Sequence, residues 1–184
     1  MTKEALIILA EGFEEIEAVT PIDVLRRAGI QVIVAGVGSE VVTGSHGIRI
    51  AADLKLEDYV GTPDAVVLPG GMPGSDNLRK SEAVLQILRR AEAAGKIIGA
   101  ICAAPAVVLA ASGFASGKTL TCYPGFEKQL GTDIRFSADR VVRDGKLVTS
   151  RGPGTALEFA LSLVRELAGE ESARRLAEGM LSRP

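Results

Sequence analysis

Hydrophobic and polar positions alternate in blocks along this chain. Short runs of branched aliphatic residues recur, and most of them lack a polar residue at every second position, as expected for strands buried on both faces of a sheet. Five such runs predict strands, at residues 5–10, 31–35, 65–68, 97–101 and 147–150. Helical spacing that stops at a glycine predicts the intervening helices, at residues 15–28, 82–94, 103–111 and 155–168.

This order of elements predicts an α/β fold. Strand, helix and strand in succession form right-handed crossover units, which build a mainly parallel sheet between two layers of helices. Two segments interrupt the order: residues 41–52 are typical of a hairpin, and residues 119–144 mix short strands with turns. We expect both to be accessory or edge elements. No repeat or linker divides the chain, so residues 1–184 are expected to form a single domain.

Composition narrows the class of partner. The chain has 184 residues, 47% of them hydrophobic, which is enough for one substantial core. Its 21 basic and 23 acidic residues are scattered, so no nucleic-acid or membrane surface is indicated and a small molecule is the favoured partner. Residues 5–10 are too short to span a bilayer and lack the flanks of a signal peptide, and we therefore expect a cytoplasmic protein. In a reducing compartment its two cysteines are expected to be thiols.

Cys102 is the sharpest candidate for chemistry. Ligands of parallel sheets bind beyond the carboxyl ends of the strands, and Cys102 lies where the strand at 97–101 passes into the next helix. Such a strand-to-helix turn is the layout of a nucleophile elbow. A helix N-terminus favours the thiolate, so we expect a lowered pKa. The alternative is a buried structural cysteine.

Two further features lie at the same end of the predicted sheet. Gly70 and Gly71 follow a strand directly, and their bare backbone could hold an oxyanion or simply form a tight turn. The first helix begins with several carboxylates, which the helix dipole alone would favour. Glu14 and Glu17 share a face there, so one of them can turn inward, while apolar residues of this helix are expected to face the core: Ile16, Val19, Val24 and Leu25.

The remaining reactive side chains carry weaker signals. His46 is the sole histidine, so any cysteine–histidine dyad depends on it, but its position in a hairpin turn predicts a solvated side chain. Cys122 is expected to be a half-buried strand thiol, with the resolution of an oxidised Cys102 as the alternative. One histidine and two distant cysteines offer no recognisable ligand spacing, so neither a metal nor a cofactor is expected.

Four segments together resemble the ThiJ/PfpI superfamily, and within it the parkinsonism-associated deglycase (DJ) branch. The resemblance runs nearly from end to end, and the segments that carry it are residues 14–17 (EEIE), 68–71 (LPGG), 100–105 (AICAAP) and 149–155 (TSRGPGT). It implies a flavodoxin-like sandwich and a homodimer with a pocket near the subunit interface. It also implies that the Cys102 thiolate accepts a hydrogen bond from a protonated Glu17.

The resemblance extends to the surroundings of Cys102. Gly70 and Gly71, with the backbone of Ala103, match the oxyanion-binding region of the family. Arg26, Arg27 and His46 fall where related proteins place interface or pocket residues. Two residues depart from the pattern: Ala103 replaces a histidine of the protease-like branch, which argues against a peptidase, and Tyr123 stands where several relatives have a pocket histidine, which shifts proton transfer onto Glu17.

The activity that the resemblance implies is that of a glutathione-independent glyoxalase or deglycase, a lyase or hydrolase with a cysteine nucleophile. Such an enzyme converts 2-oxoaldehydes such as methylglyoxal, or their adducts, to 2-hydroxy acids without a metal. The rival interpretation is an oxidative-stress protein or chaperone whose Cys102 is oxidised as a redox sensor. An amidase-like triad ranks last because it needs a histidine near Cys102.

Overall fold

The computed structural model describes residues 2–182 and has a seven-stranded sheet at its centre. Six strands run parallel, and only the edge strand β10 is antiparallel to its neighbour β11. This confirms the predicted α/β sandwich with a mainly parallel sheet. In spatial order the strands are β10 (Val141–Asp144), β11 (Leu147–Ser150), β7 (Ile97–Ile101), β6 (Ala65–Leu68), β1 (Glu4–Leu9), β2 (Gln31–Gly36) and β5 (Leu54–Lys55).

Alternate residues of each central strand point into two separate cores. In β1, Ile7 and Leu9 join the core on one face, while Leu6 and Ile8 join the core on the other. All four side chains are fully buried. Successive side chains of a strand point to opposite faces of the sheet. A strand with helices on both faces therefore has no solvent-facing position. This is why the runs show no polar alternation.

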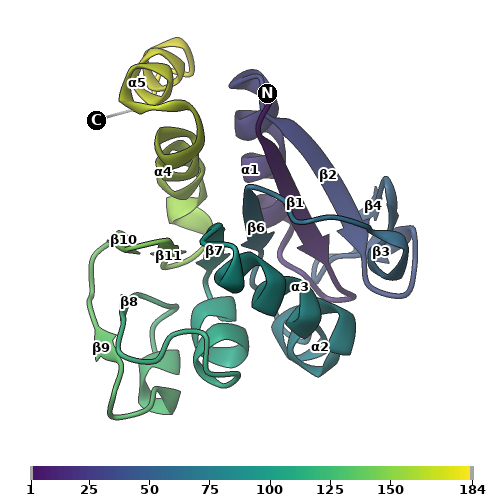
Figure 1. The fold of residues 1–184 in the computed structure, drawn as a ribbon, viewed down its shortest axis with the longest axis vertical. Helices are drawn as coiled ribbons and strands as arrows, with labels where there is room; N and C mark the ends of the chain where they lie inside the picture. The colour runs from purple at the N-terminus through teal and green to yellow at the C-terminus, as the bar shows by residue number, and fades with distance from the viewer. Residues whose placement is uncertain (1, 183–184) are drawn as a thin grey trace.

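The helices form the two outer layers (Figure 1). Helices α1 (Glu15–Arg27) and α4 (Ala156–Ala168) pack together on one face, with α5 (Glu170–Gly179) against α4. Helices α2 (Gly74–Lys80) and α3 (Glu82–Ala93) cover the other face with a π-helical turn at Pro105–Ala110. Short 3-10 turns occur at Leu56–Asp58, Phe126–Gln129 and Pro153–Thr155.

The two irregular segments form where they were expected. Strands β3 (Val41–Thr43) and β4 (Arg49–Ala51) make the predicted hairpin. In the second segment, β8 (Thr119–Leu120) pairs with β9 (Arg135–Phe136), and β10 closes the edge of the main sheet. Helices α2 and α5 were not predicted. The helix predicted at residues 103–111 is instead a π-helix that begins at Pro105, which moves the first residues after Cys102 into a turn.

Helix α1 lies on the sheet differently from its predicted orientation. Val24 and Leu25 are fully buried as expected, but Ile16 is 54% exposed and Val19 is 48% exposed. The first turn of α1 instead turns its carboxylates inward, over the ends of the strands. The prediction was wrong at Ile16 and Val19 because polar contacts to neighbouring loops, described below, outweigh the apolar stripe in this turn. Within residues 2–182, no helix is long and apolar enough to cross a membrane.

Candidate functional site

Cys102 occupies a sharp turn between β7 and the π-helix. Its φ of 64° lies in the left-handed region, which side-chain-bearing residues rarely adopt. Two backbone hydrogen bonds hold this conformation: the Cys102 N–H donates to the Ser150 carbonyl at 2.9 Å, and the Cys102 carbonyl accepts from the Tyr123 N–H at 2.8 Å. The surrounding loops therefore stabilise a strained residue, as in a nucleophile elbow.

The carboxyl group of Glu17 is buried beside Cys102. Glu17 is 0% exposed, and its Oε2 accepts a hydrogen bond of 2.8 Å from the Gly70 N–H. Its Oε1 has no nitrogen or oxygen partner among the described residues. The Glu17 N–H donates to Glu14 Oε2 at 2.8 Å, which caps α1. An inward Glu17 is therefore confirmed, and its free oxygen is available to the thiol.

The environment of Glu17 favours the protonated carboxylic acid. Burial, followed by the negative charge of Glu14, raises the pKa of Glu17 to about 8. The Gly70 N–H and the Cys102 thiol act in the opposite direction but do not overcome burial. At neutral pH Glu17 therefore carries a proton and can donate it.

The pKa of Cys102 departs from the expectation drawn from its helix N-terminus. Burial and the adjacent Glu17 raise the pKa of the thiol to about 12, although the backbone N–H groups of Gly71 and Ala103 lower it. The predicted depression of this pKa is therefore wrong: burial is the main cause of the rise, and an ionised Glu17 adds repulsion between two negative charges. Protonation of Glu17 removes that repulsion and turns the carboxyl into a donor, so the two groups act as one pair.

Gly70 makes the close approach of this pair possible. A Cβ atom on Gly70 would lie 2.6 Å from Cys102 Cβ and 2.7 Å from Glu17 Oε2, which no side chain can tolerate. The N–H of Gly70 is already used by Glu17. Of the three backbone groups considered as oxyanion donors, those of Gly71 and Ala103 lower the pKa of the Cys102 thiol.

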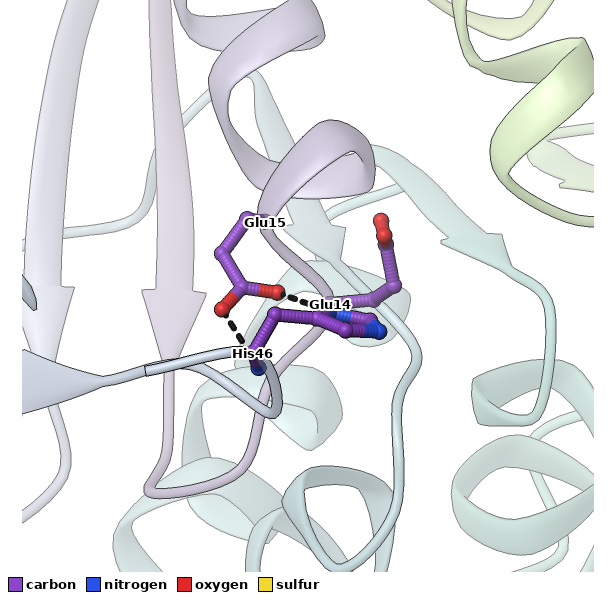
Figure 2. A group of neighbouring side chains, drawn as sticks. All are labelled: Glu14, Glu15 and His46. Carbon is purple, nitrogen blue, oxygen red and sulfur yellow. Dashed lines mark hydrogen bonds and ion pairs between the residues drawn. The ribbon is translucent and has the colours of Figure 1, made fainter. Parts of the chain in front are cut away.

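His46 does not join this pair but binds Glu15. The imidazole Nδ1 lies 2.8 Å from Glu15 Oε2, and the His46 N–H donates to Glu15 Oε1 at 2.7 Å (Figure 2). The His46 side chain is 71% exposed, as its place in a turn predicted, whereas Glu15 is only 5% exposed. Burial alone would raise the pKa of Glu15, but these hydrogen bonds and one from the Ile48 N–H lower it to about 2. The hydrogen bond to Glu15 and the charge of that carboxylate raise the pKa of His46.

The other candidates lie around the site without forming part of the pair. Tyr123 is 45% exposed, and its backbone N–H donates to the Cys102 carbonyl. The prediction of a half-buried strand thiol was wrong: Cys122 follows β8 and is fully buried in the core on the face of the sheet opposite Cys102. Both cysteines are free thiols. Arg26 and Arg27 form ion pairs within the chain, with Asp53 and Asp23.

Sequence reasoning missed the structural importance of Glu14 and Glu15. Glu15 was assigned to the favourable field of the helix dipole, and only one of Glu14 and Glu17 was expected to turn inward. Glu14 and Glu15 are nevertheless 8% and 5% exposed and form specific hydrogen bonds. Gly44 is the one local signal that could have identified Glu15. A Cβ atom on Gly44 would lie 2.3 Å from Glu15 Oε1, so the hairpin turn is shaped to receive that carboxylate.

Fold and site together define a class of protein: a parallel-sheet α/β sandwich with a strained cysteine at a strand end and a protonatable glutamate beside it. The model of the DJ-1/PfpI family matches residues 3–166, and the chain belongs to this family. It falls in the DJ-1 branch. Protein dj-1beta of Drosophila melanogaster is 50% identical over 184 residues, which cover 98% of each chain.

Solved and curated relatives extend this assignment. The crystal structure of Drosophila melanogaster DJ-1beta superposes with a TM-score of 0.93 at 48% sequence identity, with 100% of both chains covered. The glutathione-independent glyoxalase DJR-1.2 of Caenorhabditis elegans is 39% identical over 176 residues, which cover 95% of this chain and 94% of the relative.

Proposed function

We propose that this protein is a glutathione-independent glyoxalase that converts methylglyoxal-type 2-oxoaldehydes to 2-hydroxy acids. The observation that carries the proposal is the buried Cys102–Glu17 pair, in which a strained thiol and a carboxyl with a pKa of about 8 lie together. The name of the C. elegans relative supports the same activity.

The pair that has lost one proton starts the reaction. Glu17 as carboxylate takes the S–H proton of Cys102 while the sulfur attacks the aldehyde carbon of methylglyoxal. The carbonyl oxygen becomes an alkoxide, and the Glu17 carboxylic acid returns the proton to it. The product of this step is a neutral hemithioacetal on Cys102, with Glu17 again a carboxylate.

Glu17 then moves a proton between the two carbons of the substrate. It removes the C–H proton from the former aldehyde carbon, which gives an enediolate. The remaining hydroxyl proton passes to the neighbouring oxygen of the enediolate, and Glu17 delivers the carbon-derived proton to the neighbouring carbon. The resulting thioester of lactate on Cys102 is hydrolysed by water, with Glu17 as general base. The sum is methylglyoxal plus water to lactate and a proton, with no oxidant or reductant.

Backbone groups supply the electrostatic part of this mechanism. The N–H groups of Gly71 and Ala103 lower the pKa of the Cys102 thiol, so they favour negative charge on the sulfur. Fixed donors at such positions stabilise anionic intermediates strongly. His46 takes no part, because its imidazole is engaged by Glu15.

Lactate formation from methylglyoxal, without glutathione and in the presence of a chelator, tests the proposal. We expect turnover by the wild type, and a loss of roughly 1000-fold or more in Cys102→Ser and roughly 100-fold in Glu17→Gln. Cys122→Ala is the matched control, because it removes a buried thiol outside the pair, and it should retain turnover.

The redox-sensor interpretation gives a different result in the same assay. A wild type that makes no lactate, but whose Cys102 is oxidised at low peroxide concentration, would contradict the glyoxalase proposal. Loss of turnover in Cys122→Ala to the same extent as in Cys102→Ser would contradict the assigned roles.

We also propose that the chain forms a homodimer through the start of α1. Ile16, Val19 and Ile48 are 54%, 48% and 57% exposed, and the Ile48 N–H donates to Glu15 in the first turn of α1. Large apolar side chains gathered at one surface favour association. Light scattering should give twice the monomer mass for the wild type and a monomer for Ile16→Glu combined with Val19→Glu.

A further inference from the structure

A second group of metal-ligating side chains lies beside the Cys102–Glu17 pair. Glu14, Glu15 and His46 each place one ligand atom within 4.8 Å of the other two (Figure 2). They come from the start of α1 and from the β3–β4 turn, which are far apart in the sequence. Ligand spacing along the chain therefore gave no indication of this group.

The two carboxylates are held in place by the backbone. Glu15 accepts hydrogen bonds from the N–H groups of His46 and Ile48, at 2.7 and 3.4 Å. Glu14 uses Oε2 to accept the Glu17 N–H. Its other oxygen, Oε1, has no hydrogen-bond partner among the described residues and is not one of the fully buried unpaired atoms, so it reaches solvent. One carboxylate oxygen of Glu14 is therefore open to a ligand.

The contact between Glu15 and His46 has nearly the spacing of two ligands on one ion. Their Oε2 and Nδ1 atoms are 2.8 Å apart, with the Ser45 hydroxyl 3.2 Å from the same nitrogen and 3.4 Å from the same oxygen. Tetrahedral ligands at about 2.0–2.1 Å from Zn²⁺ are roughly 3.4 Å apart. Because the imidazole is 71% exposed, it can make this small movement freely.

We propose that Glu14, Glu15 and His46 form a binding site for a divalent transition-metal cation of the Zn²⁺ type. One imidazole nitrogen and two carboxylate oxygens suit Zn²⁺ and its neighbours, whereas Mg²⁺ and Ca²⁺ prefer oxygen ligands alone. Water completes the coordination on the exposed side. The three ligands are different side chains from those of the proposed reaction, so the proposal does not depend on the glyoxalase assignment.

The single histidine makes the test direct. The imidazole signals in the ¹H NMR spectrum of tag-free protein report on His46 alone. We expect Zn²⁺ to shift them and to saturate at one ion per chain, and we expect no shift with Mg²⁺. Cys102→Ser should respond as the wild type does. A response that requires Cys102 would overturn the proposal.

Matched variants separate ligation from general charge. In calorimetric titration, the affinity for Zn²⁺ should fall by roughly tenfold or more in Glu14→Gln and in His46→Gln. Glu14→Gln retains an oxygen to cap α1, and His46 is exposed, so both variants are expected to fold. Asp23→Asn removes one exposed charge from the same helix and should bind as the wild type does. Equal weakening in Asp23→Asn, or no weakening in Glu14→Gln, would refute the site.

Discussion

Glu17 lies against Cys102 because Gly70 fits between them without a side chain. The Gly70 N–H fixes one carboxyl oxygen of Glu17 at 2.8 Å, and the other oxygen has no partner among the described residues apart from the thiol. A carboxyl and a thiol buried together cannot both ionise easily, since each negative charge opposes the other. The pair therefore gains or loses one proton to solvent at a pH of about 8.

The pH dependence of turnover should follow the pair. Because the pKa of Glu17 is raised to about 8 and its base form starts the reaction, kcat/KM should rise about tenfold per pH unit below 8 and level off above it. Initial rates of lactate formation between about pH 5.5 and 9.5 check this. A profile that is flat over this range would contradict the assigned starting state.

The stability of the protein should also depend on the proton of Glu17. The folded state keeps this proton up to about pH 8, whereas the unfolded chain loses it near pH 4.5. The unfolded state thus binds fewer protons in this window, so Glu17 stabilises the fold fully below pH 4.5 and loses this contribution as pH rises to 8. The loss is roughly 3–5 kcal/mol at about 1.4 kcal/mol per pH unit.

Glu17→Gln should remove this dependence. The amide keeps the shape and an oxygen acceptor for Gly70 but does not ionise. Urea unfolding at pH 4.5 and pH 8 should therefore show a variant that gains stability relative to the wild type as pH rises. A constant difference between the two proteins at both pH values would show that Glu17 is ionised in the folded state.

Gly70→Ala should disrupt the site through contact alone. Its Cβ would lie 2.6 Å from Cys102 Cβ, 2.7 Å from Glu17 Oε2 and 2.8 Å from the Ile101 carbonyl. We expect a loss of about 2–4 kcal/mol in stability and roughly a 100-fold loss of turnover. Gly154→Ala is the matched control, because a Cβ there meets no atom within 4 Å. Similar effects of both variants would argue against the crowding explanation.

Glu15→Gln should destabilise the fold by about 1–3 kcal/mol at pH 7, because the amide keeps one acceptor oxygen but loses the negative charge and the second oxygen that bind His46. The pKa of Glu15 is lowered to about 2, so its contribution is present above pH 4.5 and is lost as pH falls towards 2. Thermal unfolding should show the difference from wild type shrinking below pH 4.5. Glu11→Gln, at an exposed glutamate that accepts the Thr43 N–H, is the control and should have little effect.

Much of the fold could be predicted from local patterns. Apolar runs without alternation identified the buried strands, since only a strand covered on both faces needs no polar side. The passage from strand to helix at Cys102 also identified the elbow, because its geometry depends on adjacent residues. The burial of the neighbours Ile7 and Ile8 in two separate cores follows from the strand period of two.

The state of the site could not be predicted in the same way. The helix N-terminus at Cys102 indicated a lowered pKa, yet burial and Glu17 raise it. The apolar spacing of α1 predicted a buried Ile16, yet the carboxylates of that turn face inward. Both errors have one cause: desolvation and charge depend on groups brought close from other parts of the chain.

The sequence by itself determined the order of strands and helices, the glycines after β6 and the cysteine after β7. Only the tertiary structure decided that Gly70 holds Glu17 against Cys102, and that His46 closes over Glu15. The physical reason is the separation along the chain between the residues that interact. Hydrophobic periodicity acts between residues a few positions apart, whereas a proton shared by two side chains depends on distances that the whole fold sets.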